Sequence, residues 1–248
     1  MSSAPVRFTS GFTQDAVWQP LGLIGIPDPF FYASYDDDFI PYNSALYTAT
    51  LDGGTVAQTV ANGAGGRVLL TTAAVAADFV GLQLTSAAFN LTAGMKCVYL
   101  TRIQVGAIAT TSFNVGLVET TATPATITDG IYINYTAAGT SMTGYVVTGS
   151  TVIGSVVIPV APVNATDIDV GFVMDRQGNV QFFAGSLLIG NKISTQNTAT
   201  LSPAAVIYNS ALTGSFTTAL LNPTLAVFTT AASAATLVSD FQLAARER

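Results

Sequence analysis

The chain has 248 residues, of which half are hydrophobic and only 9% are charged, and its net charge is −6. Its eight Lys and Arg residues are scattered, so direct binding to nucleic acid is not expected, because that binding depends on clustered basic groups. So few charges favour a subunit whose faces are covered in an oligomer or larger particle.

Residues 1–35 predict an extended N-terminal arm. Four prolines prevent regular pairing there, while aromatic residues offer apolar anchors without helix or strand periodicity. We expect ordering by packing, because disordered linkers are poor in aromatics. The arm either reaches a neighbouring subunit or wraps its own domain, and the sequence favours neither. The aromatic residues expected to be interface anchors are Phe12, Trp18, Phe30 and Phe31.

The chain shows no targeting or membrane segment. Its start, MSSAPVRFTS, lacks the basic region and apolar run of a secretory signal. No stretch reaches the ~20 uninterrupted apolar residues of a spanning helix. We therefore expect synthesis in the cytoplasm and no contact with a membrane.

Asp36, Asp37 and Asp38 form the one cluster of charge and are the only candidate metal ligands. Adjacent carboxylates repel one another, and Ca²⁺ would relieve that repulsion by binding their oxygens. The run lacks the alternate spacing of an EF-hand loop, so solvated residues before the first strand are the favoured interpretation. No cofactor is expected, with Ca²⁺ as the alternative.

Residues 36–248 predict a single all-β domain, an antiparallel jelly-roll β-sandwich. Short alternating or apolar runs recur along it, separated by turn signals such as Asp129-Gly130 and Gly178-Asn179, at the spacing typical of a sandwich. No helical stripe of convincing length is present. The predicted strands are 45–51, 67–72, 79–84, 96–105, 113–119, 131–135, 144–148, 154–160, 205–208, 224–229 and 236–244, besides the hairpin described next.

Residues 167–190, DIDVGFVMDRQGNVQFFAGSLLIG, predict a β-hairpin. Side chains alternate along both arms, and the polar run 175–179 supplies the turn. Both faces of the hairpin carry apolar residues. We therefore expect it to lie centrally in a sheet that is covered on two sides.

The residues needed for catalysis are scarce, and the chain is predicted not to be an enzyme. It contains no histidine, which removes the usual general base and imidazole metal ligand, and its single cysteine, Cys97, is expected to be a buried thiol. The only glutamates are Glu119 and Glu247, and no phosphate-binding glycine motif occurs. Three tyrosines offer either a sugar-stacking platform or strand packing, the second being favoured: Tyr132, Tyr135 and Tyr145.

Several segments together resemble a known family. They are Asp37-Asp38-Phe39, residues 113–117 (FNVGL) followed by 129–132 (DGIY), the hairpin DRQGNVQFFAGSLLIG, and residues 236–243 (TLVSDFQL) followed by Arg246. This set resembles virion structural proteins of tailed bacteriophages that have a concanavalin-like, or laminin G-like, jelly-roll sandwich. The resemblance covers roughly residues 35–248 and implies no catalytic or metal-binding residue.

The resemblance implies a capsid decoration or cement protein on the virion surface. Such a protein would bind the major capsid protein and stabilise the phage head, here as a homotrimer. A carbohydrate-binding or host-attachment module is the main alternative, and a tail or fibre subunit is a third. The fold accommodates all three roles equally well.

Overall fold

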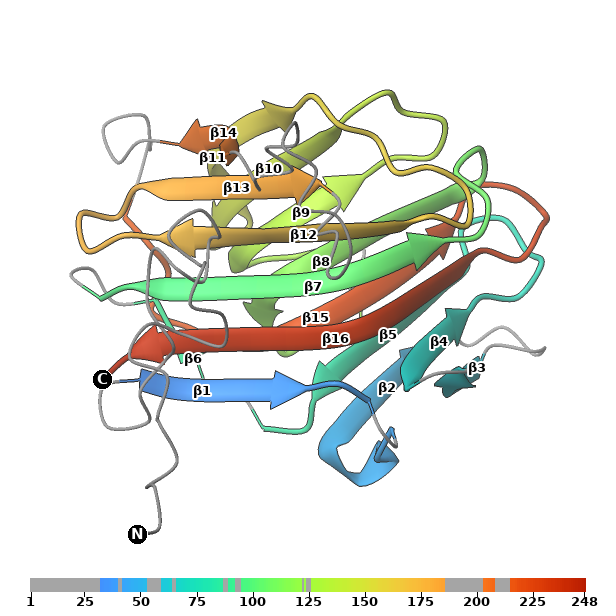
Figure 1. Cartoon of the computed structure of the whole chain (residues 1–248), viewed down its shortest axis with the longest axis horizontal. Helices are drawn as coiled ribbons and strands as arrows, with labels where there is room; N and C mark the ends of the chain where they lie inside the picture. The colour runs from blue at the N-terminus through green and yellow to red at the C-terminus, as the bar shows by residue number, and fades with distance from the viewer. Residues whose placement is uncertain are drawn as a thin grey trace, which may run out of the picture.

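The computed structural model describes residues 32–39, 42–52, 59–63, 66–86, 89–91, 95–121, 123, 126–185, 203–207 and 215–248. Over these ranges the chain forms a sandwich of two antiparallel sheets and contains no α-helix (Figure 1). The all-β sandwich expected from the alternation of side chains is confirmed. Within the same ranges, no helix has the length and apolar character needed to cross a membrane.

The first sheet, sheet A, has eight strands in the order β14-β13-β12-β7-β16-β4-β3, with β1 also paired to β16. β16 pairs with β4 through its first residues and with β1 through its last, and a register shift in its pairing with β7 falls between Ser239 and Phe241. The strands are β1 Tyr32–Asp37, β3 Thr59–Gly63, β4 Arg67–Thr71, β7 Cys97–Val105, β12 Asp167–Met174, β13 Val180–Gly185, β14 Pro203–Ile207 and β16 Thr236–Glu247.

The second sheet, sheet B, also has eight strands, in the order β11-β10-β9-β8-β15-β5-β2, with β6 paired to β15. A 3-10 turn, η2 (Ser44–Leu46), leads into β2, and the side chain of Asn43 caps it. The strands are β2 Tyr47–Leu51, β5 Phe79–Leu84, β6 Phe89–Asn90, β8 Thr111–Glu119, β9 Gly130–Tyr135, β10 Met142–Thr148, β11 Thr151–Ile158 and β15 Leu220–Thr229.

The core lies between the two sheets and is built from alternate residues of their strands. Phe172 of β12 is fully buried and stacks on Tyr99 of β7, with ring centroids 5.9 Å apart, and it meets Phe182 of β13 at 6.1 Å. Gly144 of β10 faces Phe182 from the other sheet, where a Cβ atom would come within 2.7 Å of the ring. The glycine is therefore needed for the sheets to approach closely.

The predicted hairpin is confirmed. β12 and β13 are antiparallel, and in the turn Asp175 Oδ1 accepts from the Asn179 amide at 2.9 Å while Gly178 takes φ 84°. Only β14 lies between the hairpin and the edge of sheet A, so the hairpin is less central in the sheet than expected. Residues 186–190, the last five of the predicted hairpin, lie outside the described ranges.

Three strands differ from the expectation, and one of them, β6, which was not predicted, has only two residues, Phe89–Asn90. β1 begins at Tyr32, so residues 32–35, assigned to the arm, pair with β16 in sheet A. β3, Thr59–Gly63, was not predicted because its sequence TVANG shows no alternation. β1 pairs with β16, which is distant in the chain, and β3 pairs with β4 across a turn. A local sequence pattern does not reveal either pairing.

Candidate binding surfaces

Two tyrosines lie side by side on the outer face of sheet B, the face turned away from the core. Tyr132 of β9 and Tyr145 of β10 are direct cross-strand partners, and their rings stack with centroids 5.3 Å apart. Both are half-buried. Burial is the main cause that raises the pKa of Tyr132 to about 12, so its hydroxyl stays protonated and able to donate at neutral pH. Tyr135, by contrast, points into the core, which confirms the packing interpretation for that residue.

Amide and hydroxyl side chains form the neighbouring row of this face. Asn114, Asn134 and Thr143 occupy matched positions on β8, β9 and β10. Asn134 Nδ2 donates to Asn114 Oδ1 at 2.8 Å, which fixes the orientation of both amides. No local signal in the sequence could have paired them, because the register of β8 and β9 brings them together.

The part of this face nearest β5 is closed by the segment after β8. Gln83 is buried, donates to the Glu119 carbonyl at 2.9 Å and accepts from the Thr121 amide at 3.1 Å. The Glu119 carboxylate accepts from the amides of Thr128 and Asp129, at 2.7 and 2.9 Å. Glu119 therefore holds this loop in place, and its carboxylate is occupied by structural bonds.

A pocket of about 510 Å³ opens at one end of sheet B, beside the β10–β11 turn. Asp129 lies in its wall and accepts from the Gly149 amide at 3.1 Å, while Thr148 donates to the Ser215 carbonyl at 3.2 Å. These bonds join the turn to the segment before β15. The residues lining the pocket are Asp129, Thr148, Gly149, Ile153, Ser215, Phe216, Thr217, Thr218 and Ala219.

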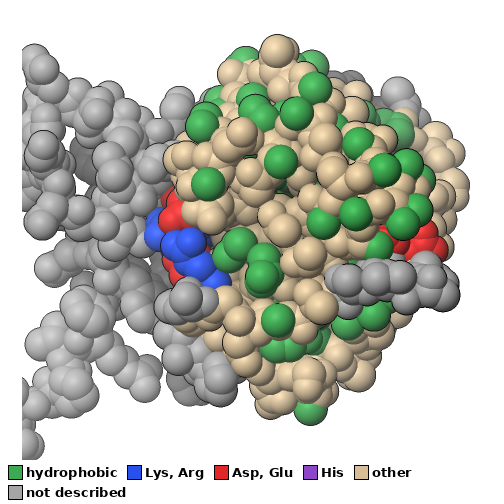
Figure 2. Space-filling view, turned by 90° about the vertical axis from the view of Figure 1, so that its right-hand side faces the viewer, with side chains coloured by type: hydrophobic (Ala, Val, Ile, Leu, Met, Phe, Trp, Pro, Cys, Tyr) green, Lys and Arg blue, Asp and Glu red, His purple; other side chains and the backbone are tan. Residues whose placement is uncertain are grey.

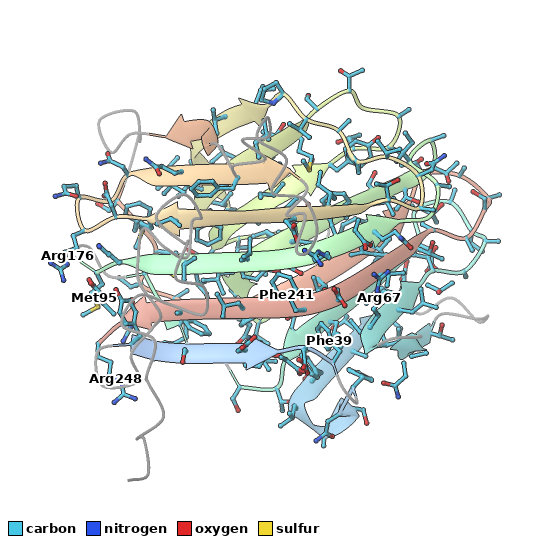
Figure 3. The ribbon with its side chains drawn as sticks, viewed as in Figure 1. Phe39, Arg67, Met95, Arg176, Phe241 and Arg248 are labelled. Carbon is cyan, nitrogen blue, oxygen red and sulfur yellow. The ribbon has the colours of Figure 1, made fainter. Side chains whose placement is uncertain are left out.

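The outer face of sheet A carries a network of ion pairs. Arg102 of β7 makes a two-pronged contact with Asp169 of β12, with Nε–Oδ1 2.9 Å and Nη2–Oδ2 3.3 Å. The Asp169 side chain is only 1% exposed. Asp240 of β16 lies between Arg102 and Arg67, at 3.5 and 3.7 Å. Figure 3 shows Arg67 and Phe241 on this face, and Figure 2 shows basic and acidic groups gathered at its margin.

The three adjacent aspartates do not converge on one point. Strand alternation turns Asp37 inward, where Tyr35 and Tyr47 donate to its Oδ2 and the Phe39 amide donates to Oδ1 at 2.7 Å. Asp36 faces outward, and burial, followed by its two acidic neighbours, raises its pKa. Across the described ranges, no three acidic or cysteine side chains form a group able to hold a metal ion.

The other residues singled out from the sequence fall into two groups. Cys97 is buried, as expected, and burial raises the pKa of its thiol to about 12. The four aromatic residues expected to anchor the arm, Phe12, Trp18, Phe30 and Phe31, lie outside the described residues.

Glu247 is expected to make stability depend on pH on the acid side. Hydrogen bonds from Arg176, and also from the Lys96 amide, lower its pKa below the ordinary value of 4.5. As the pH falls, Glu247 therefore takes up its proton in the unfolded chain before it does so in the folded chain. The stability that ionised Glu247 contributes is complete above pH 4.5 and is lost as the pH falls through the lowered pKa. Urea unfolding from pH 7 to pH 3 should show a shallower acid loss for Glu247→Gln than for the wild type. Parallel pH curves for the two proteins would contradict it.

No protein-family model matches this chain, and no curated protein resembles it in sequence. Several solved structures do share its fold. An endo-1,3-beta-glucanase from Streptomyces sioyaensis is 12% identical with a TM-score of 0.54, covering 87% of this chain and 96% of its own. The carbohydrate recognition domain of Emp47p is 10% identical with a TM-score of 0.55, covering 88% and 97%.

A third structure comes from a phage. The CBM2 module of the evolved Dit protein of Lactobacillus casei BL23 phage J-1 is 13% identical with a TM-score of 0.54, covering 87% of this chain and 96% of its own. Enzymes and binding modules thus occur among similar structures, so function has to be argued from surface residues. The chain has the jelly-roll-like β-sandwich fold that these structures, a glucanase, a carbohydrate recognition domain and a phage module, share.

Proposed function

We propose that this chain is a non-enzymatic structural protein of a tailed-phage virion, a capsid decoration protein that binds the major capsid protein. The observation that carries the proposal is the outer face of sheet B. At its exposed and half-buried positions this face carries hydroxyl, tyrosine, amide and valine side chains without a charged group: Thr48, Tyr132, Tyr145 and Ser155 in one row, and Thr50, Asn134, Thr143 and Val157 in the next, while the positions of these rows on β5, β15 and β8 are buried.

Such a face suits permanent association. Uncharged groups cost less to remove from water than ions do, and tyrosine is enriched among residues that dominate binding energy. The Asn114–Asn134 hydrogen bond already satisfies part of the hydrogen-bonding capacity of the two side-chain amides before a partner binds. The low proportion of charged residues also supports association into an oligomer, for which we propose a homotrimer, and the likeness to a phage Dit module supports a virion setting.

A non-catalytic role is supported by how the carboxylates are used. Glu119 holds the loop after β8, Asp129 caps the β10–β11 turn, and Asp169 is paired with Arg102. Glycoside hydrolysis needs two carboxyl groups flanking the sugar bond, one of them a proton donor. These three are committed to structural hydrogen bonds instead.

Binding to purified phage shells lacking the protein tests the proposal. The wild type should bind at fixed stoichiometry and as trimers, while Thr143→Lys should lower occupancy severalfold because it places an unpaired charge in the contact. Thr230→Lys, at an exposed position in a loop at the end of the sandwich, is the matched control and should bind normally. Failure of the wild type to bind shells would refute the proposal.

A second candidate function is recognition of a glycan, and one observation favours it. The stacked Tyr132–Tyr145 pair lies beside the oriented Asn114–Asn134 amides, and sugars are bound by combining aromatic faces with planar hydrogen-bonding groups. Binding of the purified chain to a glycan array, lost in Tyr145→Ala, would select this function. Shell binding without glycan binding would select the first.

A further inference from the structure

The half of sheet A's outer face near the start of β1 is apolar. Successive cross-strand rows place Ala245, Val98 and Val173 together, and next to them Leu243 and Leu100, with Phe183 across Gly171. We call these six residues the apolar strip. Gly171 leaves room for Leu100, because a Cβ atom there would lie 3.1 Å from the Leu100 side chain and 2.2 Å from the Tyr99 carbonyl oxygen.

The apolar strip is not an ordinary solvent-facing surface. Val98, Phe183 and Ala245 are 2%, 1% and 0% exposed, although alternation turns them away from the core between the sheets. The outer face of a two-sheet sandwich is normally polar and wet. Outward-facing side chains with so little exposure must be covered by a third layer of protein.

We infer that residues 1–31 of the same chain are this layer. The described chain begins at Tyr32, which packs against the apolar strip, and two residues later Ser34 pairs with Ala245. The segment thus reaches the face at its apolar end. Figure 1 shows that the start of β1 and the end of β16 lie at this same end of sheet A.

The composition and length of the segment fit the strip. Residues 1–31 contain five aromatic side chains, Phe8, Phe12, Trp18, Phe30 and Phe31, whereas residues 186–202, between β13 and β14, contain none. From β1 to β13 the face is five strands wide, about 20 Å at the usual strand spacing. An extended segment of this length spans on the order of 100 Å. It can cross its own face, and its attachment there gives it a high effective concentration.

Beyond the apolar strip the same face becomes charged. The next row holds Phe241, Arg102 and Asp169, and the network continues to Arg67. The inference goes beyond the proposed function and does not depend on it.

The single tryptophan, Trp18, reports on the arm in the full-length chain. Val173→Asp places a charge in the apolar strip and should raise acrylamide quenching of Trp18 severalfold and release residues 1–31 to limited proteolysis, with the circular dichroism of the sheets unchanged. Val157→Asp, on the outer face of sheet B where Val157 is 60% exposed, is the matched control and should change neither readout. Leu243→Asp, at a partly buried position, repeats the test if Val173→Asp does not fold.

Three results would overturn the inference. One is Trp18 quenching that stays at the wild-type level in both strip variants. Another is protease cleavage that moves to residues 186–202 and spares residues 1–31. The third is a wild-type oligomer that separates into monomers in the strip variants, because the arm would then cover a neighbouring subunit.

Discussion

Replacing Arg102 with alanine is expected to lower the free energy of unfolding by about 3–5 kcal/mol. The substitution leaves Asp169, whose side chain is 1% exposed, as a buried charge without its two-pronged partner. It also removes the contact with Asp240 and the guanidinium that lies 5.8 Å from the centre of the Phe241 ring. Chemical denaturation at neutral pH, followed by circular dichroism, measures the change.

Two further variants show whether burial is the cause. Arg102→Leu combined with Asp169→Leu removes both charges, and it should recover most of the stability lost by the single change. Arg176→Ala breaks an ion pair of similar geometry with Glu247, but the Arg176 side chain is 64% exposed, so its effect should be far smaller. Equal losses for Arg102→Ala and Arg176→Ala would contradict the explanation.

Phe172→Ala is expected to destabilise the fold by about 3–5 kcal/mol. Phe172 is fully buried and lies between Tyr99 and Phe182, so the smaller side chain leaves a cavity among three strands of sheet A. The rings of its neighbours are held by their own strands and cannot collapse into the space. The midpoint of urea denaturation measures the loss.

Phe228→Ala is the matched control for this cavity. Phe228 contacts Phe79 on the outer face of sheet B, with ring centroids 6.4 Å apart, and it is only half-buried. Removing it takes away less contact and opens no enclosed space, so the loss should be well below that of Phe172→Ala. Comparable losses for the two variants would show that the hairpin is not central to the core.

The strands could be predicted where a local pattern specified them. Alternating residues gave β5, Phe79–Leu84, with its bounds, and the 175–179 turn gave the hairpin. β1 could not be recognised as a strand, because its sequence YASYDD lacks a regular apolar–polar alternation, and its pairing with β16 joins residues more than 200 apart in the sequence. Pairing over such a separation depends on the assembled sheet and leaves no signal in the segment itself.

The residues of the candidate surfaces also divide into those that the sequence could predict and those that it could not. Tyr132 and Tyr145 were recognised as a possible platform, and strand alternation explains why Tyr135 is separate from them in the core. The same period of two also splits the aspartate run, a consequence that the sequence already contained. The Arg102–Asp169 pair could not be foreseen, since it depends on the register between β7 and β12.

The position of β16 in sheet A bears on when the protein can fold during its synthesis. β16 lies between β7 on one side and β4 and β1 on the other, so without residues 236–247 the sheet is divided into three separate pieces, β14-β13-β12-β7, β4-β3 and β1 alone. A nascent chain therefore cannot complete this layer until those residues have left the ribosome. Until then the edge of β7 remains open to strands from other nascent chains, and its protection falls to chaperones.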